Sequence, residues 1–124
     1  MNMMNRLSTA PQNMSTQEKL AQVIGTHISQ PGDCKTAIAG LAFFRREYPA
    51  PPAVCMVEPS IILVARGEKQ LWVGGEGFPY NPSRFLITSL DLPANSEVLA
   101  ASPTQPCLGL TLKLDLRILS RSEE

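Results

Sequence analysis

Residues 58–93 read EPSIILVARGEKQLWVGGEGFPYNPSRFLITSLDLP, and this stretch decides the fold class. Short apolar, β-branched and aromatic runs alternate in it with clusters of glycine, proline and asparagine. Runs of this kind, separated by turn residues at hairpin spacing, are typical of a small antiparallel β-barrel or sandwich. The sequence therefore predicts a mainly β domain built around this stretch.

Length and composition place the chain among ordinary globular domains. Its 124 residues are enough for one domain with one core, and 44% are apolar while 18% are charged. The formal net charge is zero, whereas a domain that binds nucleic acid by itself usually carries a basic surplus that neutralises phosphates. No apolar run approaches transmembrane length, and Met1–Met14 does not have the pattern of a signal peptide. We therefore expect a neutral, cytoplasmic domain that contacts neither nucleic acid nor membrane directly.

The N-terminal part predicts an arm followed by one helix. Residues 1–14 are polar with scattered methionines and predict a flexible arm or leader. Residues 15–18 form a capping-box pattern, Ser-Thr-Gln-Glu, which starts a helix over 15–29. Apolar residues follow at helical spacing and give one stripe that packs on the barrel: Leu20, Val23, Ile24 and Ile28. The cluster Pro31-Gly32-Asp33 ends the helix, and residues 15–124 form the predicted domain.

The remainder of the chain predicts a series of short strands joined by turns. Strands are expected at Leu41–Arg45, Ala53–Val57, Ile61–Ala65, Gln70–Val73, Arg84–Leu90, Glu97–Ala101 and Leu108–Leu114. Residues 48–52 contain three prolines and predict an extended connector, because proline donates no ladder hydrogen bond. Residues 66–69 predict a tight hairpin and residues 91–96 a loop. A second helix is expected to begin near Leu116, just before the chain stops, so we expect the chain to be a fragment.

Catalytic and metal-binding patterns are weak. His27 is the only histidine, so neither a Ser-His-Asp arrangement nor a histidine-rich metal site can be assembled. The three cysteines, Cys34, Cys55 and Cys107, are far apart in sequence and predict reduced thiols rather than disulfides or a zinc site. Residues 74–77 lack the Lys-Ser/Thr of a phosphate-binding loop and predict a hairpin turn instead. We therefore expect no metal, no cofactor and no enzymatic activity.

Aromatic residues on the predicted strands could line a ligand cavity. Small β-barrels can hold one small ligand in their interior or mouth. The aromatic candidates for the barrel lining are Phe43, Trp72, Phe78, Tyr80 and Phe85, with Arg45, Tyr48 or Thr88 as polar contacts. The alternative is that most of these aromatic residues form an ordinary core.

The sequence resembles the N-terminal domain of AraC-type transcriptional regulators. The resemblance covers residues 34 to about 119 and is strongest at Ser89-Leu90-Asp91-Leu92-Pro93. Other matching segments are Thr36–Leu41, Phe44-Arg45, Pro51-Pro52, Glu58-Pro59-Ser60, Ala65–Lys69, Gly74-Gly75-Glu76, Tyr80, Pro82, Phe85–Thr88, Ala101-Ser102-Pro103, Pro106-Cys107-Leu108 and Leu114-Asp115. The resemblance implies a cupin-like double-stranded β-helix that senses a small-molecule effector and often forms a homodimer. It also implies a bacterial regulator that contacts DNA only through a C-terminal helix-turn-helix domain, which is absent from this sequence.

Three functions remain open from the sequence. The first is an effector-sensing and oligomerisation domain that shifts the state of an attached DNA-binding domain. The second is a pure dimerisation module whose barrel is filled by leucines, for which the alternating Leu108–Leu114 strand is the main support. The third is a metal-independent cupin-like enzyme, which would need an acid and a base inside the barrel. For a homodimer, the helix near Leu116 is the first expected contact and an exposed strand edge the second.

Overall fold

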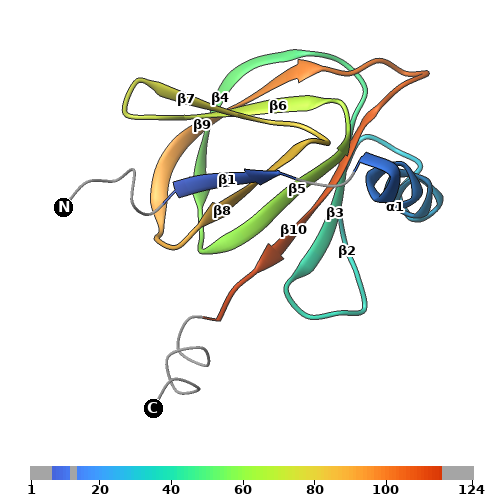
Figure 1. Ribbon diagram of the computed structural model, residues 1–124, viewed down its shortest axis with the longest axis horizontal. Coiled ribbons are helices and arrows are strands. Elements are labelled where there is room, and N and C mark those ends of the chain that lie inside the picture. Colours follow the sequence, from blue (N-terminus) through green and yellow to red (C-terminus); the bar gives the residue numbers. More distant parts are fainter. Residues whose placement is uncertain (1–6, 12–13, 116–124) are drawn as a thin grey trace.

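The computed structural model describes residues 7–11 and 14–115 and consists of two antiparallel sheets with one helix outside them (Figure 1). The six-stranded sheet has the order β1 (Leu7–Pro11), β8 (Arg84–Thr88), β5 (Ser60–Arg66), β10 (Cys107–Lys113), β3 (Leu41–Arg46) and β2 (Gly32–Lys35). The four-stranded sheet has the order β4 (Ala50–Val57), β9 (Leu92–Ala100), β6 (Glu68–Val73) and β7 (Glu76–Tyr80). The mainly β prediction is confirmed, and the arrangement is compatible with a cupin-like double-stranded β-helix.

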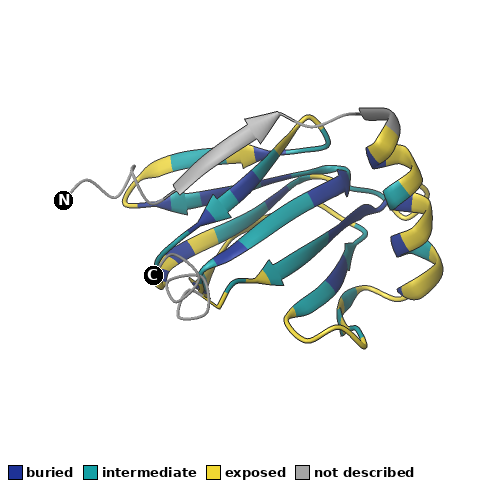
Figure 2. Cartoon of the chain, turned by 60° about the horizontal axis from the view of Figure 1, so that its bottom comes forward, coloured by how far each residue is buried: buried dark blue, intermediate teal, exposed yellow. Residues whose placement is uncertain are grey.

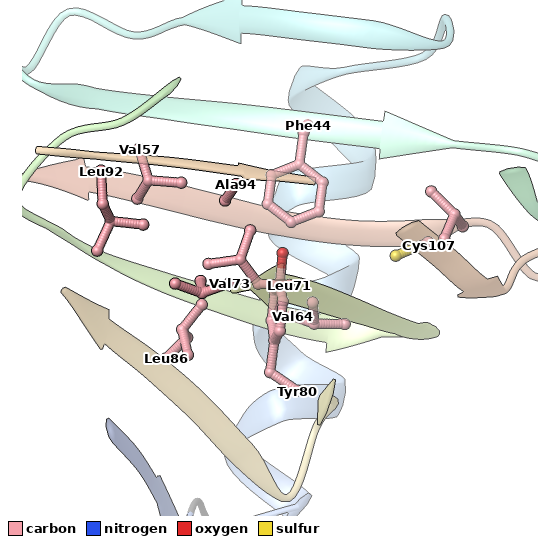
Figure 3. Close-up of a cluster of buried hydrophobic side chains, with 11 residues drawn as sticks. Phe44, Val57, Val64, Leu71, Val73, Tyr80, Leu86, Leu92, Ala94 and Cys107 are labelled. Carbon is pink, nitrogen blue, oxygen red and sulfur yellow. The ribbon is translucent and has the colours of Figure 1, made fainter. Parts of the chain in front are cut away.

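The main core lies between the two sheets. Because side chains alternate along a strand, every second residue of each strand points into this space. The six-stranded sheet contributes Phe44, Val64, Leu86 and Cys107, and the four-stranded sheet contributes Val57, Leu71, Val73, Tyr80, Leu92, Ala94 and Val98. Figure 3 shows these side chains converging from both sheets.

A second core lies on the outer face of the six-stranded sheet, under the helix α1 (Met14–His27). The predicted helix over 15–29 is confirmed to within two residues. Its buried residues Ala21, Ile24 and Ile28 pack against Phe43, Ala65 and Leu108 of the sheet, with Leu63 and Leu110 at the edge of the cluster. In Figure 2 the buried positions of this helix face the sheet and the exposed positions face away. Leu108 and Leu110 therefore point at the helix, not into the space between the sheets.

Glycines make two different turns around β6. Gly74 and Gly75 both have positive φ, 58° and 84°, and join β6 to β7 in a two-residue hairpin, as the sequence predicts. The predicted hairpin at residues 66–69 is wrong, because β5 and β6 belong to different sheets. Gly67, at φ 91°, passes the chain from one sheet to the other. A Cβ there would lie 2.7 Å from the Ala100 carbonyl oxygen and 2.8 Å from Cys107 Cα, so the crossover requires glycine.

Three segments form more strand than the sequence predicts. Residues 50–52, expected in a connector, begin the edge strand β4, whose register is irregular between Ala50 and Ala53. Prolines are tolerated there because one side of an edge strand has no hydrogen-bonded partner strand. Residues 92–96, expected in a loop, belong to β9, which lies between β4 and β6. Residues 7–11, expected within a flexible arm, pair with β8 as the antiparallel strand β1. In each case pairing with a neighbouring strand overrides a weak local preference.

The second helix expected near Leu116 lies outside the described residues. In the part of the chain that the structure describes, no helix combines the length and apolar character needed to cross a membrane.

Candidate functional site

A cavity of about 420 Å³ lies between the two sheets. This volume falls within the range of pockets that hold small molecules. Its walls come from β3, β4, β5, β6, β7, β9 and β10. Residues of the lining include Phe44, Arg46, Cys55, Ile62, Lys69, Leu71, Tyr80, Ser96 and Thr111. Asp33, Met56, Glu58 and Lys113 are exposed members of the lining, so the cavity opens to solvent between the β2–β3 edge and β4.

The alternation of β6 decides which of its side chains enter the cavity. Lys69, Leu71 and Val73 are buried on the inner face, whereas Gln70 and Trp72 lie on the outer face. Lys69 is directly opposite Tyr80 in the ladder between β6 and β7, and both residues line the cavity. A lysine therefore occupies a position that this pattern would otherwise give to an apolar side chain.

Phe44 forms a wall of the cavity because Gly109 lies opposite it. The two residues are partners in the β3–β10 ladder. A Cβ at position 109 would overlap the Phe44 ring and the Leu63 carbonyl oxygen. The absence of a side chain lets the ring lie across β10, and Figure 3 shows the Tyr80 hydroxyl pointing toward this ring from the opposite sheet.

Two cations lie near the Phe44 ring. Lys69 Nζ is 4.6 Å from the ring centroid and Arg46 Cζ is 5.8 Å from it, both within cation–π range. The side chain of Lys69 is only 9% exposed. Burial lowers the pKa of Lys69 below its usual 10.5, and the like charge of Arg46 lowers it further. Nearby Cys107 and Asp33 act in the opposite direction on this pKa, with smaller effects.

Burial holds the thiols and the phenol in and beside the cavity in their neutral forms. Burial raises the pKa of the Cys107 thiol to about 11 and also raises the pKa of Cys55, while Lys69 lowers both. Burial likewise raises the pKa of Tyr80, and a hydrogen bond with Ser96 partly offsets this effect. Near neutral pH the interior therefore contains protonated thiols and a protonated phenol. None of these groups is poised as a nucleophile or a general base at that pH.

Two ion pairs flank the cavity mouth. Arg46 Nη2 lies 2.9 Å from Asp33 Oδ1, and the same guanidinium donates to the Gly32 carbonyl at 2.9 Å. Lys113 Nζ lies 3.4 Å from Glu58 Oε2. Both pairs are solvent-accessible and contribute little to stability, but they neutralise the charges of Arg46 and Lys113 at the entrance.

The residues predicted from sequence are not gathered at one site. Tyr80 and Phe43 are among the lining residues, although Phe43 also packs under the helix. Arg45 pairs with Glu47 at 2.8 Å, and Trp72 Nε1 donates to Glu97 Oε1 at 2.8 Å on the outer face of the four-stranded sheet. Neither of these residues lines the cavity.

Two further candidates lie on β8, away from the cavity lining. Phe85 is half-buried and pairs with Ala10 of β1 in the ladder. Thr88 is fully buried, donates to the Glu58 carbonyl at 2.8 Å and accepts from the Ser60 amide at 3.2 Å. Its hydroxyl therefore fixes the start of β5. Lys69 and Arg46 were not among the lining residues predicted from sequence. Their signal was a charged residue in register with the apolar, inward-facing positions of a strand.

Among the described residues, no group of three or more histidine, cysteine, aspartate or glutamate side chains is placed to hold a metal ion. The Gly74–Gly77 segment is a hairpin turn, as expected.

Comparison with known protein families shows which family the chain belongs to. The description "AraC-type transcriptional regulator N-terminus" matches residues 37–122, which is more than half of the chain. The chain belongs to this family of AraC-type regulator N-termini. The matched residues of this AraC-type domain include strands β3 to β10 and all of the cavity lining named above except Asp33. No curated protein and no solved structure matches the chain at a significant level.

Proposed function

We propose that this AraC-type domain binds a small-molecule effector in the cavity between its sheets and thereby controls a DNA-binding domain elsewhere in the full regulator. The observation that supports the proposal is the cavity of about 420 Å³, lined by aromatic, cationic and hydroxyl side chains. An ordinary core is close-packed and leaves few voids of this size. The effector would act by binding one arrangement of the domain more tightly than another.

The proposal places DNA contact in the helix-turn-helix domain of the full regulator. The net charge of zero supports this division, because the chain has no surplus of cations for phosphates. A regulator of this kind acts where the DNA is, which for a bacterial protein is the cytoplasm. We propose that the full protein acts as a homodimer, and the exposed apolar residues Val54 and Met56 on the edge strand β4 suit a contact between two copies.

The two alternative functions have weaker support. In a pure dimerisation module with a filled barrel, the leucines of β10 would lie inside the barrel, but Leu108 and Leu110 pack against α1. A metal-independent enzyme needs an acid and a base in the interior. Lys69 and Tyr80 are titratable groups there, but burial keeps the Tyr80 phenol protonated near neutral pH. The family is one of transcriptional regulators, so effector sensing has the best support.

The test is a stability screen against small metabolites with a cavity-filling variant. A ligand at 100 times its dissociation constant stabilises the folded protein by about 2.7 kcal/mol, which raises the melting temperature of a domain of this size by roughly 3–6 °C. Thr111→Phe places a ring in the cavity and should abolish the shift. Leu112→Phe, on the opposite face of the same strand, is the matched control and should keep it. Compounds that stabilise the wild type and Thr111→Phe equally would contradict binding in the cavity.

A further inference from the structure

The charges of the cavity do not balance. In the described part of the chain, its lining contains three cations, Arg46, Lys69 and Lys113, and two carboxylates, Asp33 and Glu58. Arg46 pairs with Asp33 and Lys113 pairs with Glu58 at the mouth. Among the described residues, Lys69 has no carboxylate within salt-bridge distance, and its ammonium group lies over the face of the Phe44 ring.

The position of Lys69 is costly for the fold. A buried ammonium loses its hydration, and without an anion beside it the loss is only partly offset by a cation–π contact. A methionine would fill the same space on β6 between apolar neighbours without this cost. Arg46, whose guanidinium lies 5.8 Å from the centroid of the same Phe44 ring, adds to the positive potential at Lys69 and lowers the pKa of that lysine, although Arg46 itself is paired with Asp33.

Several other lining residues are apolar or carry neutral hydroxyl groups. Ile62, Leu71 and Phe44 provide apolar surface, and Ser96 and Thr111 provide neutral hydroxyl groups. A ligand that fits these walls has an apolar body, and a ligand that balances Lys69 has one compact negative group. A single carboxylate meets both conditions, since it brings one negative charge and two acceptor oxygens to one ammonium group.

We propose that the cavity ligand is a small monocarboxylate with an apolar body, whose carboxylate pairs with Lys69 inside the barrel. This inference rests on the proposed function, because it names the class of effector for the same cavity. Charge-assisted pairing with Lys69 sets the orientation of the ligand, and Phe44, Ile62 and Leu71 contact its apolar part. Bound carboxylate supplies the partner that Lys69 lacks among the described residues.

The test compares probes that share a skeleton and differ in the head group. Benzoate and hexanoate are titrated against benzyl alcohol, hexan-1-ol, benzylamine and phenyl phosphate, and binding is followed by the backbone amide signals of β6 and β10 in ¹H–¹⁵N correlation spectra. The carboxylates should bind more tightly than the alcohols and the amine of the same skeleton. Phenyl phosphate separates a requirement for a carboxylate from a requirement for any compact anion, and equal or tighter binding of this probe would overturn the carboxylate assignment.

Two variants locate the charge that the probes detect. Lys69→Met keeps the length of the side chain, removes the charge and should weaken carboxylate binding by about tenfold or more, which brings the carboxylate and the alcohol to similar affinity. Lys35→Met, at an exposed lysine of β2 outside the cavity lining, is the matched control and should leave every affinity within about twofold. The wild-type preference for carboxylate over alcohol tests the inference even if Lys69→Met does not fold.

The outcomes separate this inference from the proposed function. Carboxylate and alcohol probes that perturb the cavity amides equally, with no effect of Lys69→Met, would overturn the monocarboxylate assignment and leave effector binding intact. If no probe perturbs the cavity amides at millimolar concentration, both the assignment and binding in this cavity are contradicted.

Discussion

Cys107, in the core between the sheets, and Lys69, in the cavity lining, are close enough to influence each other, yet burial drives both toward their neutral forms. Burial lowers the pKa of Lys69 and raises the pKa of Cys107 to about 11, and the attraction between ammonium and thiolate only partly opposes these shifts. Desolvation therefore outweighs pairing at this point of the fold. Near neutral pH, Cys107 acts as a small apolar side chain rather than as a thiolate.

The raised pKa of Cys107 predicts a specific loss of stability in alkaline solution. The unfolded thiol ionises near 9.0 and the folded thiol near 11, so between these values the folded state binds more protons and the free energy of unfolding falls as pH rises. The stabilising effect is complete below pH 9 and lost above pH 11. We expect Cys107→Ala to remove about 2–3 kcal/mol of the fall between pH 8.5 and 11, measured by urea denaturation.

Cys34→Ala is the control for this experiment, because Cys34 lies on β2 and is only partly buried, whereas Cys107 is fully buried. It should keep the alkaline fall of the wild type. If Cys107→Ala and the wild type lose stability in parallel over this range, the thiol does not have a raised pKa in the folded protein.

At the scale of elements, the helix α1 is held by one buried face. Ile24 is fully buried and packs with Ala21 and Ile28 against the outer face of β5 and β10, while Val23 is 51% exposed. Gly25 also lies near this contact, where an added Cβ would be 3.6 Å from Leu108 Cδ1. The helix and the leucines of β10 thus form a core that is separate from the cavity.

Ile24→Ala should destabilise the domain by about 2–4 kcal/mol, because it removes three carbon atoms from a fully packed site. Val23→Ala, one residue away on the exposed face, should change the free energy of unfolding by less than about 0.5 kcal/mol. Urea unfolding at pH 7 measures both. Equal and small effects of the two substitutions would show that the helix is not docked through this face.

Local patterns could predict several elements and not others. The capping box and apolar stripe predicted α1, and Gly74-Gly75 predicted the β6–β7 hairpin, since both signals act within a few residues. Pairing partners are not local. The Gly67 segment has the composition of a hairpin but crosses between sheets, and the prolines of β4 are accepted only because that strand lies at an edge. No short stretch of the sequence indicates either the crossover at Gly67 or the edge position of β4.

The candidate site was harder to predict than the elements for the same reason. Tyr80 was expected in the lining and is there, but Trp72 was chosen on residue type and lies on the outer face of β6. If the inward-facing positions of β6 are shifted by one residue, Trp72 moves to the outer face and Lys69 and Leu71 move to the inner face. Which face is inward depends on the second sheet, and this information becomes available only once both sheets are assembled.

At the scale of the whole molecule, the two sheets enclose a space that the fold does not fill. The leucines of β10, which could have filled it, are used to dock α1, and Gly109 leaves room for Phe44 on the inner face. The result is a cavity of about 420 Å³ with a buried lysine that has no carboxylate partner among the described residues, in a chain of the AraC-type regulator family. This combination is the basis for proposing that the domain senses an effector between its sheets.

A crystal structure of the chain grown in the presence of benzoate tests this proposal most directly. We expect electron density for the benzoate ring between the two sheets, against Phe44 and Leu71, with a carboxylate oxygen within about 4 Å of Lys69 Nζ. A structure in which side chains fill the space between the sheets and benzoate is absent or bound only on the surface would contradict effector binding in this cavity.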